Sequence, residues 1–489
     1  MSSSRRAPLA IIFITVFIDL LGFGIVLPLL PRYAKHFDAD GLTLGLLMAS
    51  FSAMQFLFAP LWGRVSDRVG RRPILILGLA GSAFFYTLFG YCTSLGAEGT
   101  MLGLGVLPWL FICRIGAGIA GATIPTAQAY IADVTGPAER GKGMALIGAA
   151  FGIGFTFGPL LGAGFVPGDI SDFGSRQGSQ VARALEVTPE QSTEIGRFVD
   201  DYARERRSLG RSNTSRQREE LKKARDAKIA SVLTPEQQST LHRLGAPSAA
   251  PGYVAGVLSG LALLSAIFLL PESLPPGGTA QERHWLDISQ LRHAVSQPGI
   301  GLILLTMFLT TFAFGQFEST LSLLTEFLGL ADRDNYLVFA YIGFVLSLSQ
   351  GMLVRRLIPR LGEVITGLIG TLLMTAGLLL IGLAATREST GMLYGVLPIV
   401  VVGFSALNPS LQSLLSRRTS ASQQGGVLGL GQSMSALARI LAPVLGLTLN
   451  DVNITLPYWT GAGIMTVGIL LTLSLRQPEA TETMGASAQ

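Results

Sequence analysis

The chain has 489 residues, of which 49% are hydrophobic and only 14% are charged, and its mean hydropathy is +0.50. Soluble globular proteins carry about a quarter charged residues, so this composition excludes an ordinary soluble protein and indicates a membrane protein. The formal net charge of +5 does not indicate nucleic-acid binding, because the basic residues lie mostly in loops beside apolar segments, where they set membrane orientation.

About twelve apolar segments are long enough to cross the roughly 30 Å apolar core of a bilayer as helices. In chain order they are residues 8–31, 41–62, 73–95, 105–132, 143–166, 252–271, 299–321, 337–357, 364–385, 390–414, 424–448 and 457–475. The first follows Arg5 and Arg6 but lacks a small-residue cleavage site. We therefore expect an uncleaved first helix and not a signal peptide.

Arginine and lysine in short loops favour the cytoplasmic side of a membrane. With the N-terminus inside, the short outer loops hold only Arg32, Lys35, Arg333 and Arg387, and the other short-loop basic residues fall inside. Both termini are therefore expected on the cytoplasmic side of an inner membrane. The expected division is an N-terminal bundle (1–166, helices 1–5), a periplasmic helical insertion (167–250), helix 6 (251–273), a cytoplasmic linker (274–298), a C-terminal bundle (299–476, helices 7–12) and a cytoplasmic tail (477–489).

A short, strongly basic stretch, residues 63–73, connects the second and third apolar segments. It reads Gly63-Arg64-Val65-Ser66-Asp67-Arg68-Val69-Gly70-Arg71-Arg72-Pro73. Two glycines and a final proline predict a tight helix–loop–helix turn. Residues 350–362 are also basic and contain glycine at the matching point of the second half, which indicates a six-plus-six repeat with the substrate site between the halves. For the stretch 63–73, the alternative is a basic anchor that sets membrane orientation and has no further role.

The polar segment 167–250 interrupts the pattern and holds two copies of one phrase. The copies are Val187-Thr188-Pro189-Glu190-Gln191 and Leu233-Thr234-Pro235-Glu236-Gln237. Each predicts a helix start, with Thr as N-cap, Pro at the first helical position and Gln closing a capping box. An apolar stripe is expected from Leu185, Ile195, Phe198, Val199 and Tyr202, a charged helix over 215–232, and flexible linkers over 168–180 and 245–251.

These paired phrases resemble the L-T-x-x-Q motif of small periplasmic stress proteins and metal-resistance accessory proteins, with Val187 in place of leucine in the first copy. The resemblance implies a periplasmic binding or chaperone-like module with a partner of its own. An inert helical hairpin is the alternative, since a capping box alone explains much of the pattern. The four histidines are scattered and the two cysteines, Cys92 and Cys113, lie in apolar runs, so no metal site is expected.

Ionisable residues at membrane depth are costly and are functional candidates by default. Asp19 lies roughly 16 Å into the first segment, close to the bilayer midplane. It is expected to load and release a proton, or to form a buried ion pair with Arg114. Glu318, towards the outer end of segment seven, and Arg439 in segment eleven are the candidates of the second half. Polar candidates for a cavity lining are Gln55, Gln128, Gln350, Asn408, Gln412 and Gln432.

Four stretches carry a resemblance to the twelve-helix drug:proton antiporters of the major facilitator superfamily, in their tetracycline-exporter-like branch. They are residues 19–31, the basic stretch 63–73, residues 114–123 running on to 130–133, and residues 154–162 around Gly158-Pro159. The resemblance implies an all-α membrane protein of about 12 helices in two six-helix bundles, the major facilitator fold. The insertion between helices 5 and 6 is foreign to that family.

The resemblance also implies roles for individual residues. Asp67 would cap the cytoplasmic start of helix 11 and Arg71 would pair with Asp133, which together would lock the outward-facing state. Arg114 would assist proton coupling, and Asp19 would contact the substrate or the proton. The remaining switch residues are Gly63, Arg68, Gly70 and Arg72, and the antiporter-motif helix holds Gly154, Gly158, Pro159 and Gly162.

The expected function is proton-coupled export of small amphipathic or cationic compounds by a monomer that uses no cofactor and is not an enzyme. Tetracycline itself is not expected, because Phe85 and an apolar run around Met374 stand where its exporters carry aspartates. One alternative is uptake of a small metabolite by symport or facilitated diffusion. A second is a membrane-tethered periplasmic sensor or chaperone acting through residues 167–250.

Overall fold

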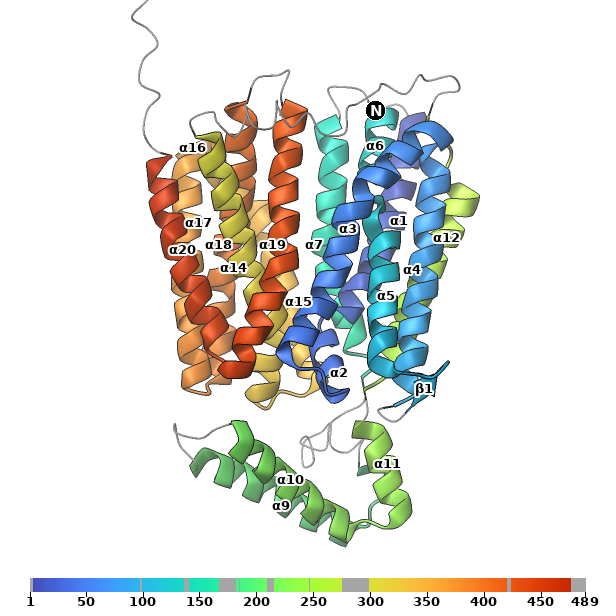
Figure 1. Cartoon of the computed structure of the whole chain (residues 1–489), viewed down its shortest axis with the longest axis vertical. Coiled ribbons are helices and arrows are strands. Elements are labelled where there is room, and N and C mark those ends of the chain that lie inside the picture. Colours follow the sequence, from blue (N-terminus) through green and yellow to red (C-terminus); the bar gives the residue numbers. More distant parts are fainter. Residues whose placement is uncertain are drawn as a thin grey trace, which may run out of the picture.

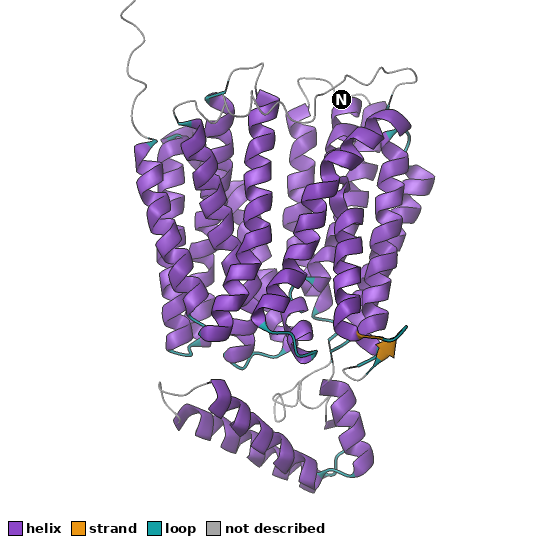
Figure 2. Ribbon diagram, viewed as in Figure 1, coloured by secondary structure: helices purple, strands orange, loops and turns teal. Residues whose placement is uncertain are grey.

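The computed structural model describes residues 3–96, 99–135, 140–166, 182–183, 185–208, 215–245, 247–274, 299–419 and 424–475. Helices dominate this part of the chain (Figure 2). Its one antiparallel hairpin pairs β1 (Thr100–Met101) with β2 (Leu104–Gly105). Eleven helices are long and apolar enough to cross a membrane, and Leu146–Gly162 is a further, shorter apolar helix. These twelve segments agree with the number expected from the sequence.

The helices form two bundles side by side (Figure 1). The N-terminal bundle contains α1 (Ser3–Val26), α2 (Leu30–His36), α3 (Gly41–Val69), α4 (Arg71–Ser94), α5 (Val106–Ala120), the 3₁₀ turn η1 (Gly121–Thr123), α6 (Ile124–Val134), α7 (Arg140–Gly162) and α12 (Ala250–Leu269). The C-terminal bundle contains α14 (Ile300–Phe327), α15 (Asp332–Leu348), the π-helical η3 (Ser349–Val354), α16 (Arg355–Leu361), α17 (Glu363–Thr386), α18 (Thr390–Arg417), α19 (Gln424–Val452) and α20 (Leu456–Ser474).

The predicted tight turn between the second and third helices is present at Gly70, but it is shorter than the basic stretch because both neighbouring helices continue into it. The second helix runs on to Val69, so the basic stretch is mostly helical and only Gly70 separates α3 from α4. Gly70 has φ +107°, a conformation that glycine adopts without steric cost. Residues 349–361 likewise continue the eighth helix through η3 and α16. Basic side chains are tolerated at such helix ends because they extend into the polar membrane interface.

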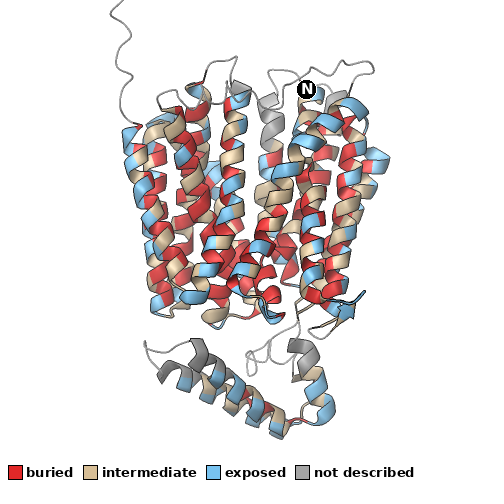
Figure 3. Cartoon of the chain, in the orientation of Figure 1, coloured by how far each residue is buried: buried red, intermediate tan, exposed pale blue. Residues whose placement is uncertain are grey.

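Each bundle has its own apolar core, and large apolar side chains also cover its outer surface. The C-terminal core includes Met374, Leu378 and Leu407, all fully buried. By contrast Phe84 is 60% and Phe268 77% exposed, and exposed residues recur along the outer faces of both bundles (Figure 3). Apolar surface of this extent on spanning helices is expected for helices that contact lipid.

The insertion forms three helices, α9 (Pro189–Ser208), α10 (Ser215–Val232) and α11 (Pro235–Gly245). They lie beyond the end of the bundles opposite the N-terminus (Figure 1). We call this end of the molecule the insertion end and the other the basic end. The expected linker 168–180 lies outside the described residues. The expected linker 245–251 is shorter than predicted, since α12 already begins at Ala250.

Both predicted capping boxes of the insertion are present. Thr188 N–H donates to Gln191 Oε1 (3.0 Å) and Gln191 N–H to Thr188 Oγ1 (3.3 Å), and the same pair of bonds joins Thr234 and Gln237. The side-chain amides of Gln191 and Gln237 also bond to each other, at 3.1 and 3.3 Å. The two phrases therefore meet as a symmetric pair that fixes the start of α9 against the start of α11.

The predicted apolar stripe packs inside this insertion. Leu185 and Ile195 are buried together with Ile229 of α10 and with Leu233, which directly follows α10. Phe198 and Val199 border that cluster. Tyr202 lies under the guanidinium of Arg225, 4.7 Å from its ring centre. The insertion thus has its own small core.

The two bundles are joined from the membrane middle to the insertion end. Hydrogen bonds link Arg32 with Ser322 and Asp332, Pro28 with Asn335, Ile25 with Tyr336, Gly41 with Asp451 and Thr156 with Ser347. Within the described residues no hydrogen bond joins the bundles at the basic end. The protein is therefore in a conformation closed at the insertion end.

Candidate transport site and gates

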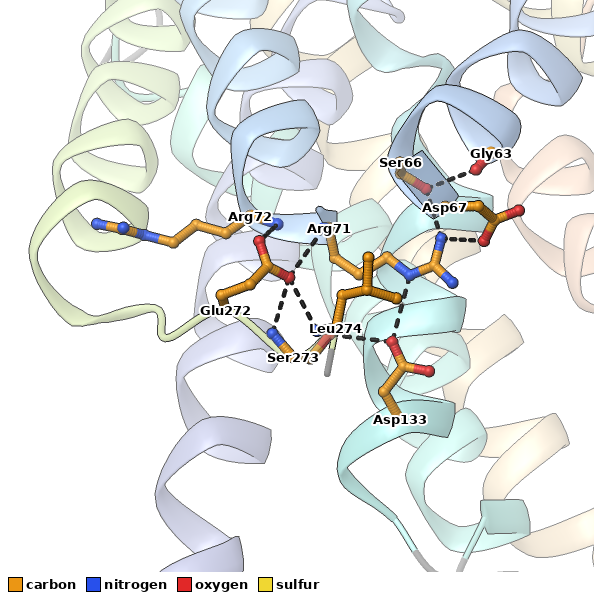
Figure 4. Close-up of polar contacts among 9 residues, drawn as sticks. All are labelled: Gly63, Ser66, Asp67, Arg71, Arg72, Asp133, Glu272, Ser273 and Leu274. Atoms are coloured by element: carbon orange, nitrogen blue, oxygen red, sulfur yellow. Dashed lines mark hydrogen bonds and ion pairs between the residues drawn. The ribbon is translucent and has the colours of Figure 1, made fainter. Parts of the chain in front are cut away.

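Arg71 is the centre of a polar cluster at the basic end (Figure 4). Its Nη1 forms an ion pair with Asp67 and donates to Ser66 Oγ (2.7 Å), while its Nε donates to Asp133 Oδ2 (3.2 Å). Arg71 is buried, so these acceptors replace the water that its guanidinium has lost. The pairing of Arg71 with Asp133 expected from the resemblance is present, and it joins the start of α4 to the end of α6.

The expected contact of Asp67 with helix 11 is absent from the described residues. The Asp67 side chain is 45% exposed and faces Arg71 of its own bundle. In this conformation Asp67 therefore pairs within its own bundle and not across to α19. Of the other switch residues, Gly63 accepts from Ser66, Arg72 donates to the Ile267 carbonyl oxygen (2.6 Å), and Arg68 is exposed.

Glu272, which belongs to none of the sequence motifs, completes this cluster. Its Oε1 accepts from the backbone N–H groups of Arg71 (2.9 Å), Ser273 (2.8 Å) and Leu274 (3.0 Å), and its Oε2 from that of Arg72 (3.1 Å). The carboxylate therefore caps the N-terminus of α4, where the helix dipole favours negative charge. Its position directly after the sixth apolar segment places Glu272 at the membrane edge, but it does not indicate which helix the carboxylate caps.

We expect Glu272→Gln to loosen the start of α4. Partial burial raises the pKa of Glu272, but the backbone donors of Leu274, Arg71, Ser273 and Arg72 outweigh it and hold the pKa below its ordinary value. The carboxylate then stabilises the fold above its unfolded pKa, and this contribution is lost as pH falls through the lower folded value. Because water screens the site, the loss is about 1 kcal/mol. In detergent, the Tm of Glu272→Gln should be lower than that of the parent protein at pH 7, and the two Tm values should converge near pH 3. A Tm difference that does not change with pH would contradict this cap.

A second polar cluster, centred on Arg32, closes the insertion end. The buried guanidinium of Arg32 donates to the Ser322 carbonyl oxygen (3.1 Å), to Thr325 Oγ1 (2.8 Å) and to Asp332 Oδ1 (2.6 Å). It thus reaches from α2 in one bundle to α14 and the start of α15 in the other. From the sequence alone Arg32 is recognised only as an outer-loop charge, because its partners lie far away in the chain.

Backbone oxygens at the end of α1 complete this closure. Pro28 O accepts from Ser322 Oγ (2.7 Å) and Asn335 Nδ2 (2.8 Å), and Ile25 O accepts from Tyr336 OH (2.7 Å). Asn335 and Tyr336 are fully buried. Buried polar groups that are fully paired in this way specify one arrangement of the two bundles. We call the contacts of Arg32, Pro28 and Ile25 with α14 and α15 the insertion-end latch.

Asp19 lies in the middle of the first span, Pro8–His36. It accepts a hydrogen bond from Ser259 Oγ of α12 (2.9 Å). No ion pair with Arg114 is formed, so the structural alternative of a buried Asp19–Arg114 pair is wrong for this conformation. Hydroxyl groups both donate and accept, so they suit a carboxyl group that is charged in one state and protonated in another.

Arg114 of α5 is 3% exposed. Its guanidinium lies 4.3 Å from the centre of the Phe51 ring, and its Nε and Nη1 have no hydrogen-bond partner. No acidic side chain in the described chain forms an ion pair with it. Burying a cation without a counter-charge is costly. Arg114 is therefore a buried donor group that lacks its acceptor.

Glu318 is deeper in the membrane than expected. The seventh helix continues to Phe327, so Glu318 lies about 13 Å from its end and not near it. Its neighbours Gln316 and Ser319 are buried. Arg439 of α19 acts electrostatically on the Glu318 carboxylate, but no ion pair within 4 Å joins these two described residues. Their pairing is therefore looser than a salt bridge.

The polar cavity candidates are scattered over several helices. Gln55 donates to the Gly121 carbonyl oxygen (3.3 Å), and Gln412 donates to Asn408 (3.1 Å). Gln128, Gln350 and Gln432 are exposed. A cavity-lining role for this set stays a prediction.

The antiporter-motif helix, α7, packs closely through its glycines. A Cβ atom on Gly154 would meet Leu20, and one on Gly158 would meet Gly24 and Leu21 of α1. Gly162 lies against the Tyr336 ring, which belongs to the insertion-end latch. Pro159 lies inside the helix. These small residues let α7 contact both α1 and the opposite bundle.

The two positions that depart from tetracycline exporters are packing positions. A Cβ atom on Gly116 of α5 would overlap the Phe85 ring, and Met374 is fully buried in the C-terminal core. Neither place therefore offers an acidic group to a cationic ligand.

Comparison with known proteins identifies relatives of this fold. The family model described as Major Facilitator Superfamily matches residues 12–170 and 241–443 and leaves out most of the insertion. Multidrug resistance protein 2 of Bacillus subtilis is 25% identical over 483 residues, 96% of each chain. Major facilitator superfamily domain-containing protein 10 of Homo sapiens is 28% identical over 508 residues, 96% of this chain and 94% of that protein.

Two further similarities are a partial match to a tetracycline resistance protein and a full-length match to a solved structure. The class D tetracycline resistance protein of Salmonella ordonez is 40% identical over 167 residues, which are 34% of this chain and 39% of that protein. The crystal structure of the human organic anion transporter MFSD10 (TETRAN) has a TM-score of 0.60 at 24% identity, covering 96% of this chain and 99% of that one. At this identity the structural match supports the fold alone.

Proposed function

This chain belongs to the Major Facilitator Superfamily, and we propose that it is a proton-coupled transporter that exports small amphipathic or cationic compounds by alternating access. The insertion end would face the periplasm, and both termini the cytoplasm. The observation that carries the proposal is Asp19, a carboxyl group at mid-membrane that accepts a hydrogen bond from the Ser259 hydroxyl group and forms no ion pair with a described cation. Such a group can change its protonation state during transport.

The two polar clusters supply the gates that alternating access requires. The insertion-end latch joins the bundles in this conformation, and the Arg71 cluster at the basic end is complete within one bundle. Rocking the bundles about the central site would break the first set of contacts and bring Asp67 towards α19. Relatives named for multidrug and tetracycline resistance support a drug-like substrate.

The experiment that tests the proposal is substrate-stimulated proton movement in energised inverted membrane vesicles. A panel of dyes and drugs, including tetracycline, would be added in turn. Proton release on adding a compound is expected for antiport and would name a substrate class. No release across the panel, with folded protein shown to be present, would contradict export by antiport and favour uptake of a metabolite.

A second candidate substrate class is organic anions, favoured by the missing counter-charge of Arg114. A carboxylate has the bidentate geometry that a guanidinium prefers, and MFSD10, a structural neighbour, is named an organic anion transporter. We expect Arg114→Gln to reduce transport of an amphipathic carboxylate by about 10-fold or more. Its uncharged methyl ester should be affected far less. Equal loss for acid and ester would indicate that Arg114 does not bind the anionic group.

A further inference from the structure

Among the described residues, the insertion segment is hydrogen-bonded to the gate helix α2 through the hydroxyl group of Tyr33. Tyr33 is 2% exposed and stacks on Phe89, with 6.3 Å between ring centres. Its OH donates to the Ser248 carbonyl oxygen at 2.6 Å. Ser248 lies between the end of α11 at Gly245 and the start of α12 at Ala250. It is therefore part of the segment through which the insertion returns to the membrane.

The same segment also contacts the point where the chain leaves the membrane bundle. Ser248 Oγ donates to the Phe165 carbonyl oxygen (3.4 Å) and accepts from the Ala250 N–H (3.3 Å). Phe165 follows α7 and precedes the insertion. We call Phe165 and residues 247–249 the neck of the insertion. The neck thus holds both ends of the insertion together at one place, directly against Tyr33.

Tyr33 and Arg32 are neighbours in α2, a helix of only seven residues. Adjacent helical residues point in directions about 100° apart, and here Arg32 binds the C-terminal bundle while Tyr33 binds the neck. Opening the insertion end requires α2 and α14 to separate. The neck must then follow α2, or the Tyr33–Ser248 bond must break.

We propose that Tyr33 is a positioning residue of the insertion-end gate and that it transmits the position of the insertion to that gate. This rests on the alternating-access part of the proposed function, but not on its substrate or on proton coupling. Coupling of this kind is reciprocal. A molecule that displaces α11 would therefore change the ease with which the gate opens, and gate opening would change the affinity of the insertion for that molecule.

The test measures gate opening directly, without transport. Leu447 is fully buried at the insertion end, where its carbonyl oxygen lies against Gly41. Leu447→Cys, in a background with Cys92→Ala and Cys113→Ala, reports opening by its rate of reaction with a water-soluble maleimide in nanodiscs. The insertion is deleted by replacing residues 170–246 with a short Gly-Ser linker, which keeps the neck. Tyr336→Phe is the matched control, because it removes the same kind of phenol-to-carbonyl bond from the same gate but not from the neck.

We expect the deletion to raise the labelling rate between about 2-fold and 10-fold, the factor that one hydrogen bond supports. The same rise should appear in the Tyr336→Phe background and should vanish in the Tyr33→Phe background. An equal effect of the deletion in all three backgrounds, or no effect in the parent, would overturn the proposal. Labelling does not depend on proton coupling, so a failed vesicle assay leaves this result interpretable.

A milder variant covers the case in which the deletion protein does not insert. Gln191→Ala combined with Gln237→Ala removes the amide pair that holds α9 against α11 and keeps the chain length. Its effect on labelling should again be present with Tyr33 and absent with Tyr33→Phe. An effect that ignores the Tyr33 substitution would rule out transmission through the neck.

Discussion

Asp19→Asn is expected to abolish proton-driven export while the protein remains folded in the membrane. An asparagine has the shape of aspartate and can still accept a hydrogen bond from Ser259, but it cannot bind and release a proton. Proton-transfer groups contribute roughly 100-fold or more to the steps they serve, so substrate-stimulated proton release in inverted vesicles should fall at least about 100-fold. Exchange of substrate down its own gradient should survive, because it needs no proton.

Ser259→Ala is the matched control for Asp19→Asn. It removes the hydroxyl partner of Asp19 and leaves the carboxyl group. We expect a loss below about 10-fold, the effect of one hydrogen bond, together with a shifted pH dependence of transport. Normal proton-driven efflux by Asp19→Asn would contradict a proton-coupling role for Asp19 and would make Glu318 the next candidate.

The spans and the helix starts of the insertion were predictable because their causes are local. An apolar run of about twenty residues crosses a bilayer whatever its neighbours, and Thr188 and Gln191 satisfy each other's backbone groups within one turn. The insertion's apolar stripe followed from helical periodicity in the same way. Boundaries were less predictable, because the polar, arginine-containing stretch 64–69 was predicted as part of a loop although the helix continues to Val69.

The contacts of the gates were not predictable from one sequence. Arg32 and Asp332 are 300 residues apart, and Glu272 lies 201 residues from Arg71. Nothing in the local pattern of either partner indicates the other. The resemblance did supply the Arg71–Asp133 pair, but it described the contacts of another conformational state for Asp67. Sequence motifs include residues that form contacts in different conformational states of a transporter, whereas a structure shows only the contacts of one state.

Arg32→Met should open the insertion end more than any other single substitution. Methionine retains much of the apolar stem of arginine but removes the donors to Ser322, Thr325 and Asp332. Breaking a buried pair costs about 3–5 kcal/mol. Asp332, with 35% of its side chain exposed, regains water when Arg32 is replaced. We therefore expect the free energy of opening the insertion end to fall by about 2–3 kcal/mol. That corresponds to a rise of roughly 30-fold to 150-fold in labelling of Leu447→Cys by maleimide.

Arg387→Met separates this local effect from a general loss of positive charge. Arg387 lies at the same end of the molecule, directly after α17, and is exposed. Its substitution should leave the labelling rate within about 2-fold of the parent, as usual for surface positions. Adding Asp332→Asn to Arg32→Met should raise labelling by less than the sum of the single effects, because the two residues act as one pair. If Arg32→Met and Arg387→Met labelled at the same rate, Arg32 would not hold the gate. If Arg32→Met alone opens it, the closed state is maintained mainly by one buried guanidinium, and its neighbour Tyr33 is well placed to alter that balance.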